Sequence, residues 1–333
     1  MAGRDAPKQS RAVRTQVEGR LGATAAPKTP MVSVIMNCFN GERYLPEAID
    51  SVYAQTCGDW EIVFWDNAST DDSAEIARNY DERVRYHRSG ATASLGNARN
   101  QAISVARGEF IAFLDCDDLW LPDKLEQQLM LFARPRVGLV FSDVTCFNDR
   151  GYAKSKYGRN RPPEGNVFEA LLSTNYLCMS SVVVRAEVFR DGDLRFDPSF
   201  SAIEDRDLFV RIAREWELAY VPLALCKYRM HEQSTSFSIP SLFLEEEEAL
   251  IRKYRGLYPE FHELYEARCR EQLERDRAVV QWRQGDGKGA RERMRPLVRQ
   301  GRRHAVTYLA MQLPYGVVHW FRTLLSGRAT SNY

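Results

Sequence analysis

The chain has 333 residues, of which 44% are hydrophobic and 27% charged, and its formal net charge is +1. This composition is that of a globular protein long enough for one large α/β domain with an extension, or for two ordinary domains. A charge so close to zero gives no electrostatic reason to expect nucleic-acid binding.

The seven cysteines are scattered along the chain, with no Cys-x-x-Cys pair among them. Several lie in apolar, strand-like runs, where a reduced cysteine behaves as a small hydrophobic residue. The pattern argues against a disulfide framework and against a zinc site, and it favours a reducing, cytoplasmic environment.

Both ends of the chain are basic. Residues 1–28 are rich in Arg and Lys with no apolar segment behind the charges, so we predict a disordered basic leader and not a secretory signal. Residues 291–303 are also basic, and the apolar, aromatic segment 305–325 follows. No run of about 18 apolar residues occurs, which argues against a membrane-spanning helix. Residues 291–325 therefore either contact a membrane interface or form a helix that packs on the main domain.

Apolar, β-branched runs alternate with helical patterns over the first half of the chain. Strands are predicted at 32–37, 61–66, 84–87, 110–115 and 137–144, and helices at 44–54, 69–80, 96–106 and 122–132. This alternation predicts right-handed βαβ units and a mostly parallel, Rossmann-like sheet with helices on both faces.

The regular alternation ends near residue 150. A loop or lid at 150–166, a strand at 180–184, a helix at 204–216 and two short strands at 218–222 and 226–230 are predicted to follow. After Ser238 the chain is charged and helical. We expect a leader at 1–28, an α/β domain at 29–237 and a helical C-terminal extension at 238–333.

Polar residues follow three of the predicted strands. Asn37 opens the first of these turns, Asp66 and Asn67 open the second, and the segment Asp-Cys-Asp-Asp at 115–118 forms the third. Ligands of an open parallel α/β sheet bind beyond the carboxyl ends of its strands. Crowded carboxylates repel unless a cation lies between them, and Mg²⁺ and Mn²⁺ favour one or two carboxylates together with phosphate oxygens. The alternative is that the third turn is solvated, with Asp118 capping the next helix.

These segments together resemble the nucleotide-binding half of the family 2 glycosyltransferases, which have the GT-A fold. The similarity is carried, in order, by VSVIMNCFNGERYLPEAIDSVYAQT, WEIVFWDNASTDDS and GNARNQAISVARGEFIAFLDCDDLW, and more weakly by IEDRDLFVRIA and YRMHEQSTS. The resemblance implies a GT-A domain that transfers a sugar from a nucleotide-sugar donor to an acceptor hydroxyl.

The resemblance implies nucleotide-binding roles for the first two turns. Asn37 and Phe39 stand where the family contacts and stacks on the nucleobase, and Glu42 stands where it holds the turn. Asp66 and Asn67 occupy positions where the family usually has two acidic residues that bind the pyrimidine. Because the amide of an asparagine can both donate and accept, a UDP-sugar and a dTDP-sugar both remain candidate donors.

The resemblance also implies a metal site. Asp115 and Asp117 match the family's Asp-x-Asp, with Asp115 toward the ribose and Asp117 on the Mg²⁺ or Mn²⁺ that bridges the phosphates. His231 matches a position that closes over the diphosphate or metal in some relatives, although a lone histidine is also common in exposed loops. Arg99 either pairs with these carboxylates or makes a structural salt bridge.

A general base is expected at the start of the helix near residue 204. A metal on the diphosphate stabilises the leaving group, so one base for the acceptor hydroxyl is what remains to be supplied. The resemblance assigns this role to Asp205, with Glu204 and Asp207 as alternatives. Spacing alone would favour three acids that complement a helix dipole. A single base predicts direct displacement, with inversion at the anomeric carbon.

The acceptor implied by bacterial relatives is a glycan or a lipid-linked glycan of polysaccharide biosynthesis, reached from the cytoplasm or from the inner face of the membrane. Two other functions remain open. A nucleotidyltransferase would ordinarily have a Gly-rich basic loop after the first strand, where this chain has NCFNGERY. A non-catalytic nucleotide-sugar-binding protein would not need the acids at 115, 117 and 205. The sequence indicates neither the donor sugar nor the oligomeric state.

Overall fold

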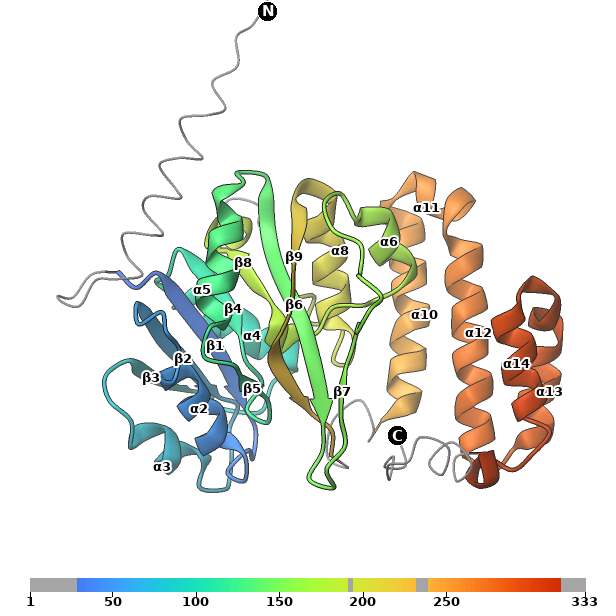
Figure 1. Cartoon of the computed structure of the whole chain (residues 1–333), viewed down its shortest axis with the longest axis horizontal. Helices are drawn as coiled ribbons and strands as arrows, with labels where there is room; N and C mark the ends of the chain where they lie inside the picture. Colours follow the sequence, from blue (N-terminus) through green and yellow to red (C-terminus); the bar gives the residue numbers. More distant parts are fainter. Residues whose placement is uncertain (1–28, 191–193, 232–238, 319–333) are drawn as a thin grey trace, which may run out of the picture. The chain divides into compact units, whose positions relative to one another are not determined.

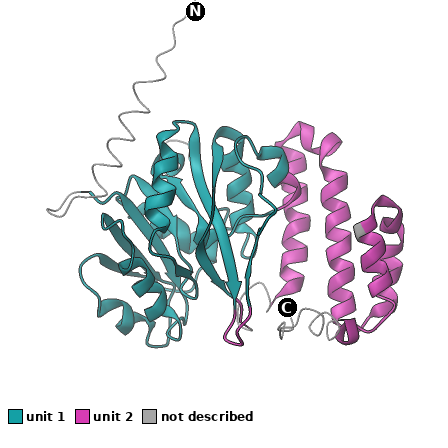
Figure 2. Ribbon diagram, in the orientation of Figure 1, with its two compact units in different colours: residues 1–147, 153–171, 175–229 teal, residues 148–152, 172–174, 230–333 magenta. Residues whose placement is uncertain are grey.

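The computed structural model describes residues 29–190, 194–231 and 239–318, so the predicted leader lies outside the described residues. The chain divides into two compact units (Figure 2). The first unit comprises the residues up to 147 together with 153–171 and 175–229, and the second comprises 148–152, 172–174 and the residues from 230 onward.

The first unit is built on a nine-stranded sheet with the order β3-β2-β1-β4-β8-β6-β9-β5, and β7 pairs with β6 (Figure 1). The strands are β1 (Val32–Cys38), β2 (Trp60–Asp66), β3 (Val84–Arg88), β4 (Phe110–Phe113), β5 (Leu119–Trp120), β6 (Val137–Phe147), β7 (Ala153–Ser155), β8 (Val183–Arg185) and β9 (Glu217–Arg229). Six of them point the same way, and β5, β7 and β8 run against them. The predicted mostly parallel sheet is confirmed.

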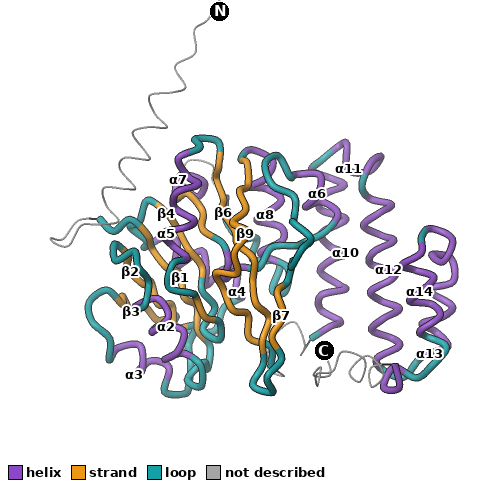
Figure 3. Tube along the Cα trace, in the orientation of Figure 1, coloured by secondary structure: helices purple, strands orange, loops and turns teal. Residues whose placement is uncertain are grey.

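Helices flank the strands of this unit (Figure 3). They are α2 (Leu45–Tyr53), α3 (Ser73–Arg78), α4 (Leu95–Ser104), α5 (Lys124–Leu129), α6 (Phe168–Ser173), α7 (Ala186–Arg190) and α8 (Glu204–Glu215). Pro46 occupies the first turn of α2, and the Ser94 hydroxyl caps α4 by accepting from the Asn97 N–H. Every residue of β1 is buried, as expected of a central strand covered on both faces.

Strand β9 differs from the prediction. The sequence predicted two short strands, at 218–222 and 226–230, but β9 is continuous over 13 residues. Its pairing with β6 jumps between Val221 and Ala224, so Pro222 lies in a bulge. A bulge accommodates proline because that residue has no ladder hydrogen bond to donate there.

A buried carboxylate at the amino-terminal ends of β1 to β4 is fully paired. Glu61 is 2% exposed and accepts hydrogen bonds from the Ser33 hydroxyl at 2.6 Å, Arg85 at 3.0 Å and the Arg107 Nε at 2.8 Å. Burial raises the pKa of Glu61, but the hydrogen bonds from Ser33 and Arg107 outweigh it, and the pKa lies below its ordinary value. A side chain on Gly108 would come within 2.4 Å of the Ser33 nitrogen, so glycine permits this close approach.

The second unit is helical within the described residues. It contains α10 (Pro240–Leu257), α11 (Pro259–Leu264), α12 (Glu266–Arg283), α13 (Gly287–Met294), a 3₁₀ turn (Arg295–Gln300) and α14 (Arg302–Ala310). One of its cores gathers Ala278, Trp282, Ala290, Met294, Leu297 and Met311. The predicted helical extension is confirmed. Among the described helices, none combines the length and the apolar character needed to cross a bilayer.

Candidate active site

The three predicted polar turns meet at the carboxyl-terminal edge of the sheet. Strands β1 and β2 end in register, with Cys38 opposite Asp66, and β4 ends beside them with Phe113 opposite Ile35. The loops after these strands therefore start side by side, at the edge where parallel α/β sheets bind ligands.

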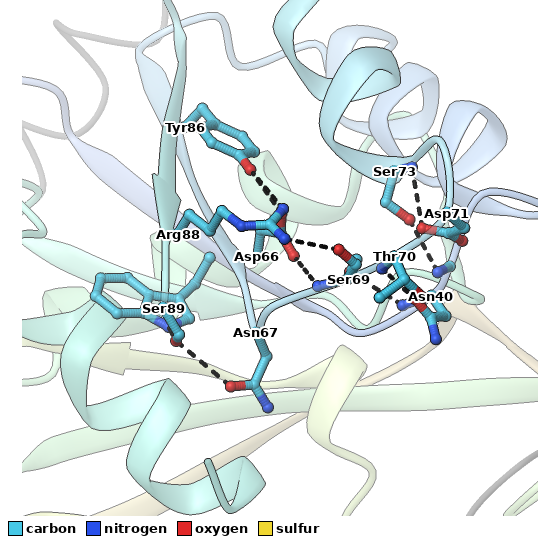
Figure 4. Close-up of polar contacts among 12 residues, drawn as sticks. Asn40, Asp66, Asn67, Ser69, Thr70, Asp71, Ser73, Tyr86, Arg88 and Ser89 are labelled. Atoms are coloured by element: carbon cyan, nitrogen blue, oxygen red, sulfur yellow. Dashed lines mark hydrogen bonds and ion pairs between the residues drawn. The ribbon is translucent and has the colours of Figure 1, made fainter. Parts of the chain in front are cut away.

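The first two turns are hydrogen-bonded to each other (Figure 4). The Asn40 N–H donates to the Ser69 hydroxyl at 3.0 Å, and the Asn40 side chain accepts from the Thr70 N–H at 2.8 Å. Asn40 and Ala68 have φ angles of 53° and 65°, in the left-handed region that residues with a side chain rarely adopt. The contacts between the two turns hold this strained backbone, and such strain is characteristic of functional sites.

Glu42 joins the same two turns. Its carboxylate accepts from the Asp72 N–H at 3.0 Å, and its own N–H donates to the Asp71 carboxylate at 2.9 Å. Glu42 therefore contacts backbone, in keeping with the family role of holding the turn, and its part in nucleotide binding stays a prediction.

Asp66 is completely buried, and its carboxylate is hydrogen-bonded to other residues of the protein. It accepts hydrogen bonds from the Ser69 N–H at 2.7 Å, the Tyr86 hydroxyl at 2.6 Å and the Arg88 guanidinium at 2.6 Å (Figure 4). Burial raises the pKa of Asp66, and the bonds from Tyr86 and Ser69 more than reverse this, so the pKa is lowered. Asp66 therefore stays ionised and fixes the start of the second turn.

Asn67 holds the loop that leads into α4. Its amide NH₂ donates to the Ala93 carbonyl at 2.8 Å, and its amide oxygen accepts from the Ala93 N–H at 3.0 Å. Both functional groups of the amide thus bind backbone, while the predicted contact with the nucleobase remains untested.

Asn37 and Phe39 differ from these residues. Asn37 is 8% exposed, and neither polar atom of its amide has a hydrogen-bond partner among the described residues. Since buried polar groups are nearly always paired, this amide fits a position whose partner is a ligand. Phe39 is 53% exposed and offers a ring face on which a base could stack.

Arg99 connects the third turn to helix α8. Its buried guanidinium lies 2.8 Å from Asp115 and 2.5 Å from Glu204. Burial raises the pKa of Asp115, which Arg99 opposes and Asp117 reinforces, and the net shift is upward. The sequence left open whether Arg99 pairs with the carboxylates of the third turn or makes a structural salt bridge. The structure shows both contacts, because Arg99 pairs with Asp115 and also with Glu204 of α8.

Arg229, the last residue of β9, fixes the same turn from the other side. Its N–H donates to the Asp118 carboxylate at 2.8 Å, its Nε donates to the Asp117 carbonyl at 2.9 Å, and its guanidinium lies 2.6 Å from Glu47. Asp118 is not the cap of the next helix, because the residue at the N-cap position of α5 is Asp123. Sequence reasoning did not single out Arg229, although an arginine within the short strand predicted at 226–230 was a usable signal.

The three acids that open α8 have different partners. Glu204 pairs with Arg99, and the buried Asp207 pairs with Arg211 at 2.6 Å. Within the part of the chain that the structure describes, Asp205 is the one of the three without an ion pair. Burial raises the pKa of Asp205, with Arg99 acting against it.

The third turn fits a cation shared with a substrate. Asp115 has 37% of its side chain exposed, Asp117 is half-buried, and both offer the hard oxygen ligands that Mg²⁺ and Mn²⁺ favour. No three His, Cys, Asp or Glu residues in the described ranges are gathered so as to hold a metal by themselves. His231 lies two residues beyond the end of β9, but 232–238 lie outside the described residues, and its role stays a prediction.

Residues 33–192 match the family model described as glycosyl transferase family 2. This part of the chain is a family 2 glycosyltransferase domain. The E. coli UDP-Glc:alpha-D-GlcNAc-diphosphoundecaprenol beta-1,3-glucosyltransferase WfgD is 27% identical to the enzyme over 209 residues, which cover 62% of this chain and 79% of that protein. The enzyme class predicted from the sequence is confirmed.

Two solved structures share the fold of the glycosyltransferase. S. aureus TarS in complex with UDP-GlcNAc superposes with a TM-score of 0.56 at 20% identity, over 73% of this chain and 70% of that chain. Mannosyltransferase PcManGT from Pyrobaculum calidifontis, in complex with GDP-Man and Mn²⁺, gives a TM-score of 0.56 at 18% identity over 96% and 91%. The predicted GT-A fold is confirmed.

Proposed function

We propose that the enzyme transfers a sugar, with inversion, from a UDP- or dTDP-sugar to a hydroxyl of a glycan or lipid-linked glycan. The observation that carries this proposal is the bridge made by Arg99, which ties Asp115 of the third turn to Glu204, the neighbour of Asp205. One buried arginine thereby couples the proposed diphosphate side of the site to the proposed acceptor side.

Asp115 and Asp117 would hold Mg²⁺ or Mn²⁺, which when bound stabilises the negative charge of the departing diphosphate. Their half-buried carboxylates and the lack of a third acidic ligand in the described residues suit a cation completed by phosphate oxygens. His231 is kept as a candidate further ligand. PcManGT, which has been solved with GDP-Man and Mn²⁺, supports a donor-bound metal in this fold.

Asp205 would act as the general base. It accepts the proton of the acceptor hydroxyl while that oxygen bonds to the anomeric carbon, and the electrons of the breaking C–O bond go to the diphosphate. The raised pKa makes the carboxylate a stronger base than an exposed aspartate, and no ion pair has to be broken to use it. One base acting opposite the leaving group gives inversion.

The nucleotide would bind across the first two turns. Phe39 provides the exposed ring for stacking, and the unpaired amide of Asn37 provides a donor and an acceptor. Asp66 and Asn67 border this position, and Glu42 holds the turn beneath it. The similarity to WfgD, which is named for UDP-Glc, and to TarS, which was solved with UDP-GlcNAc, supports a uridine donor.

We also propose that residues 29–237 form the catalytic domain and that residues 238–333 extend it. The acceptor in the name of WfgD is attached to diphosphoundecaprenol, which supports a lipid-linked acceptor reached at the inner face of a membrane. The proposal therefore includes peripheral membrane contact through residues 291–325.

A thermal-shift panel tests the donor assignment, because a ligand that binds only the folded state raises its stability. UDP-, dTDP- and GDP-sugars are compared with and without Mn²⁺. We expect a metal-dependent rise in Tm with a pyrimidine nucleotide sugar, and a rise with GDP-sugars alone would contradict the assignment. Proton NMR of the product tests the mechanism, and retention at the anomeric carbon would exclude a single-base displacement.

A further inference from the structure

The outward face of α14 and of the segment after it is apolar. Val306 and Leu309 are 60% and 66% exposed, and Leu313 and Val317 are 49% and 39% exposed. Four of the ten large hydrophobic side chains found exposed in the described residues thus lie within one short segment. Such clustering marks an interaction surface, whereas single exposed apolar residues are ordinary.

The opposite face of the same segment supplies the core of the second unit. His304 and Met311 are buried, and Tyr308 and Tyr315 pack against the core that contains Trp282. These inward positions recur every three or four residues, as the turns of a helix require. A surface helix packed in this way normally presents polar residues outward, so the apolar outward face needs its own explanation.

The same region is strongly basic. After Glu292 the sequence contains seven arginines and no Asp or Glu, although the whole chain has a net charge of only +1. Arg295, Arg299 and Arg302 are exposed, and they form no ion pair with any described residue. Positive charge beside apolar side chains is the combination that an anionic membrane interface attracts.

We propose that a basic-apolar surface, formed by Arg295, Arg299, Arg302, Val306, Leu309 and Leu313, docks on the headgroup region of an anionic lipid bilayer. The apolar side chains would enter the boundary between headgroups and acyl chains, and the arginines would contact lipid phosphates. A second copy of this chain fits less well, because two such surfaces would bring arginines together with no local acid to balance them. This surface rests on and makes specific the membrane contact in the proposed function. Because vesicle binding needs no nucleotide sugar, its failure would leave the proposed donor and base untouched.

Flotation of the full chain with vesicles tests this surface. Vesicles of phosphatidylcholine mixed with phosphatidylglycerol are compared with vesicles of phosphatidylcholine alone, and we expect flotation with the anionic vesicles only. The triple variant Val306→Ser, Leu309→Ser, Leu313→Ser should lower the partition coefficient at least about tenfold. The matched control replaces Leu257 and Leu264, which are 52% and 64% exposed elsewhere in the second unit, by serine and should float like the parent.

Two results would overturn the proposal. The parent chain could stay unbound with anionic vesicles, or the control could lose binding as fully as the triple variant. Light scattering distinguishes the remaining alternative, because a parent chain that is dimeric, does not float and becomes monomeric with the three serines would identify a second copy as the partner.

Discussion

The two ends of the parallel strands differ in how completely their buried polar groups are paired. At the amino-terminal edge, Glu61 receives hydrogen bonds from Ser33, Arg85 and Arg107, and its pKa is lowered. At the carboxyl-terminal edge, the Asn37 amide has no partner among the described residues. The same strands therefore end in a complete polar network on one side and an incomplete one on the other.

The difference in pairing predicts which edge of the sheet mainly stabilises the fold and which edge mainly binds a ligand. A complete buried network stabilises the fold, since each donor and acceptor has a protein partner. An incomplete one costs stability but leaves groups free to bind a ligand. Substitutions at the amino edge should therefore change the free energy of unfolding, and substitutions at the carboxyl edge should change donor binding and turnover.

The largest effect on activity is expected for Asp205→Asn. Loss of a general base should reduce kcat by about 10²–10⁴-fold, while the thermal shift produced by the donor is retained. Steady-state release of the nucleoside diphosphate measures it. Asp207→Asn on the same helix is the control, since Asp207 is committed to Arg211. Equal losses of kcat in the two folded variants would show that Asp205 is not the base.

Replacing Arg99 should affect stability and activity together. Arg99→Met leaves Glu204 as a buried carboxylate without its cation, which should cost about 3–5 kcal/mol in the free energy of unfolding. Adding Glu204→Met should recover most of that stability, as measured by urea unfolding. Turnover should stay low, because Asp115 has still lost its partner. Recovery of full turnover in the double variant would show that Arg99 has only a structural role.

Glu61→Gln tests the amino edge. We expect a loss of about 2–3 kcal/mol at neutral pH, with the Kd for the donor unchanged. Because the folded pKa is lowered, the carboxylate contributes stability above its unfolded pKa of about 4.3 and loses it as pH falls through the folded pKa. The difference between parent and variant should therefore shrink in urea titrations at acidic pH. A difference that does not change with pH would contradict the ionised network.

The smallest effect on stability is expected for Asn37→Ala. Its amide has no hydrogen bond to lose among the described residues, so the free energy of unfolding should change by about 1 kcal/mol or less. Removal of a contact with the ligand should raise the Kd for the donor about tenfold, which calorimetry measures. An unchanged Kd would place the nucleotide away from Asn37.

Features that depend on local pattern were predictable from the sequence. A run of a few residues is enough to recognise each of the buried strands, the polar turns after them and the acidic start of α8. Partners far apart in the chain were not predictable, as Arg229 and Glu47 lie 182 positions apart. The single strand β9 was predicted as two, because the bulge at Pro222 that keeps it continuous depends on register with the neighbouring strand and not on the residue itself. For the same reason, the reversed direction of β8 could not be read from its apolar run.

The position of Arg229 has a practical consequence for dividing the molecule. The contacts that fix the turn at 115–118 come from the final residue of the first unit, through its main-chain nitrogen as well as its guanidinium. A fragment intended to isolate that unit must therefore extend beyond this arginine. A cut one residue earlier would remove those contacts to Asp117 and Asp118, so such a fragment would keep every acidic residue of the site but lose the bonds that fix the turn at 115–118.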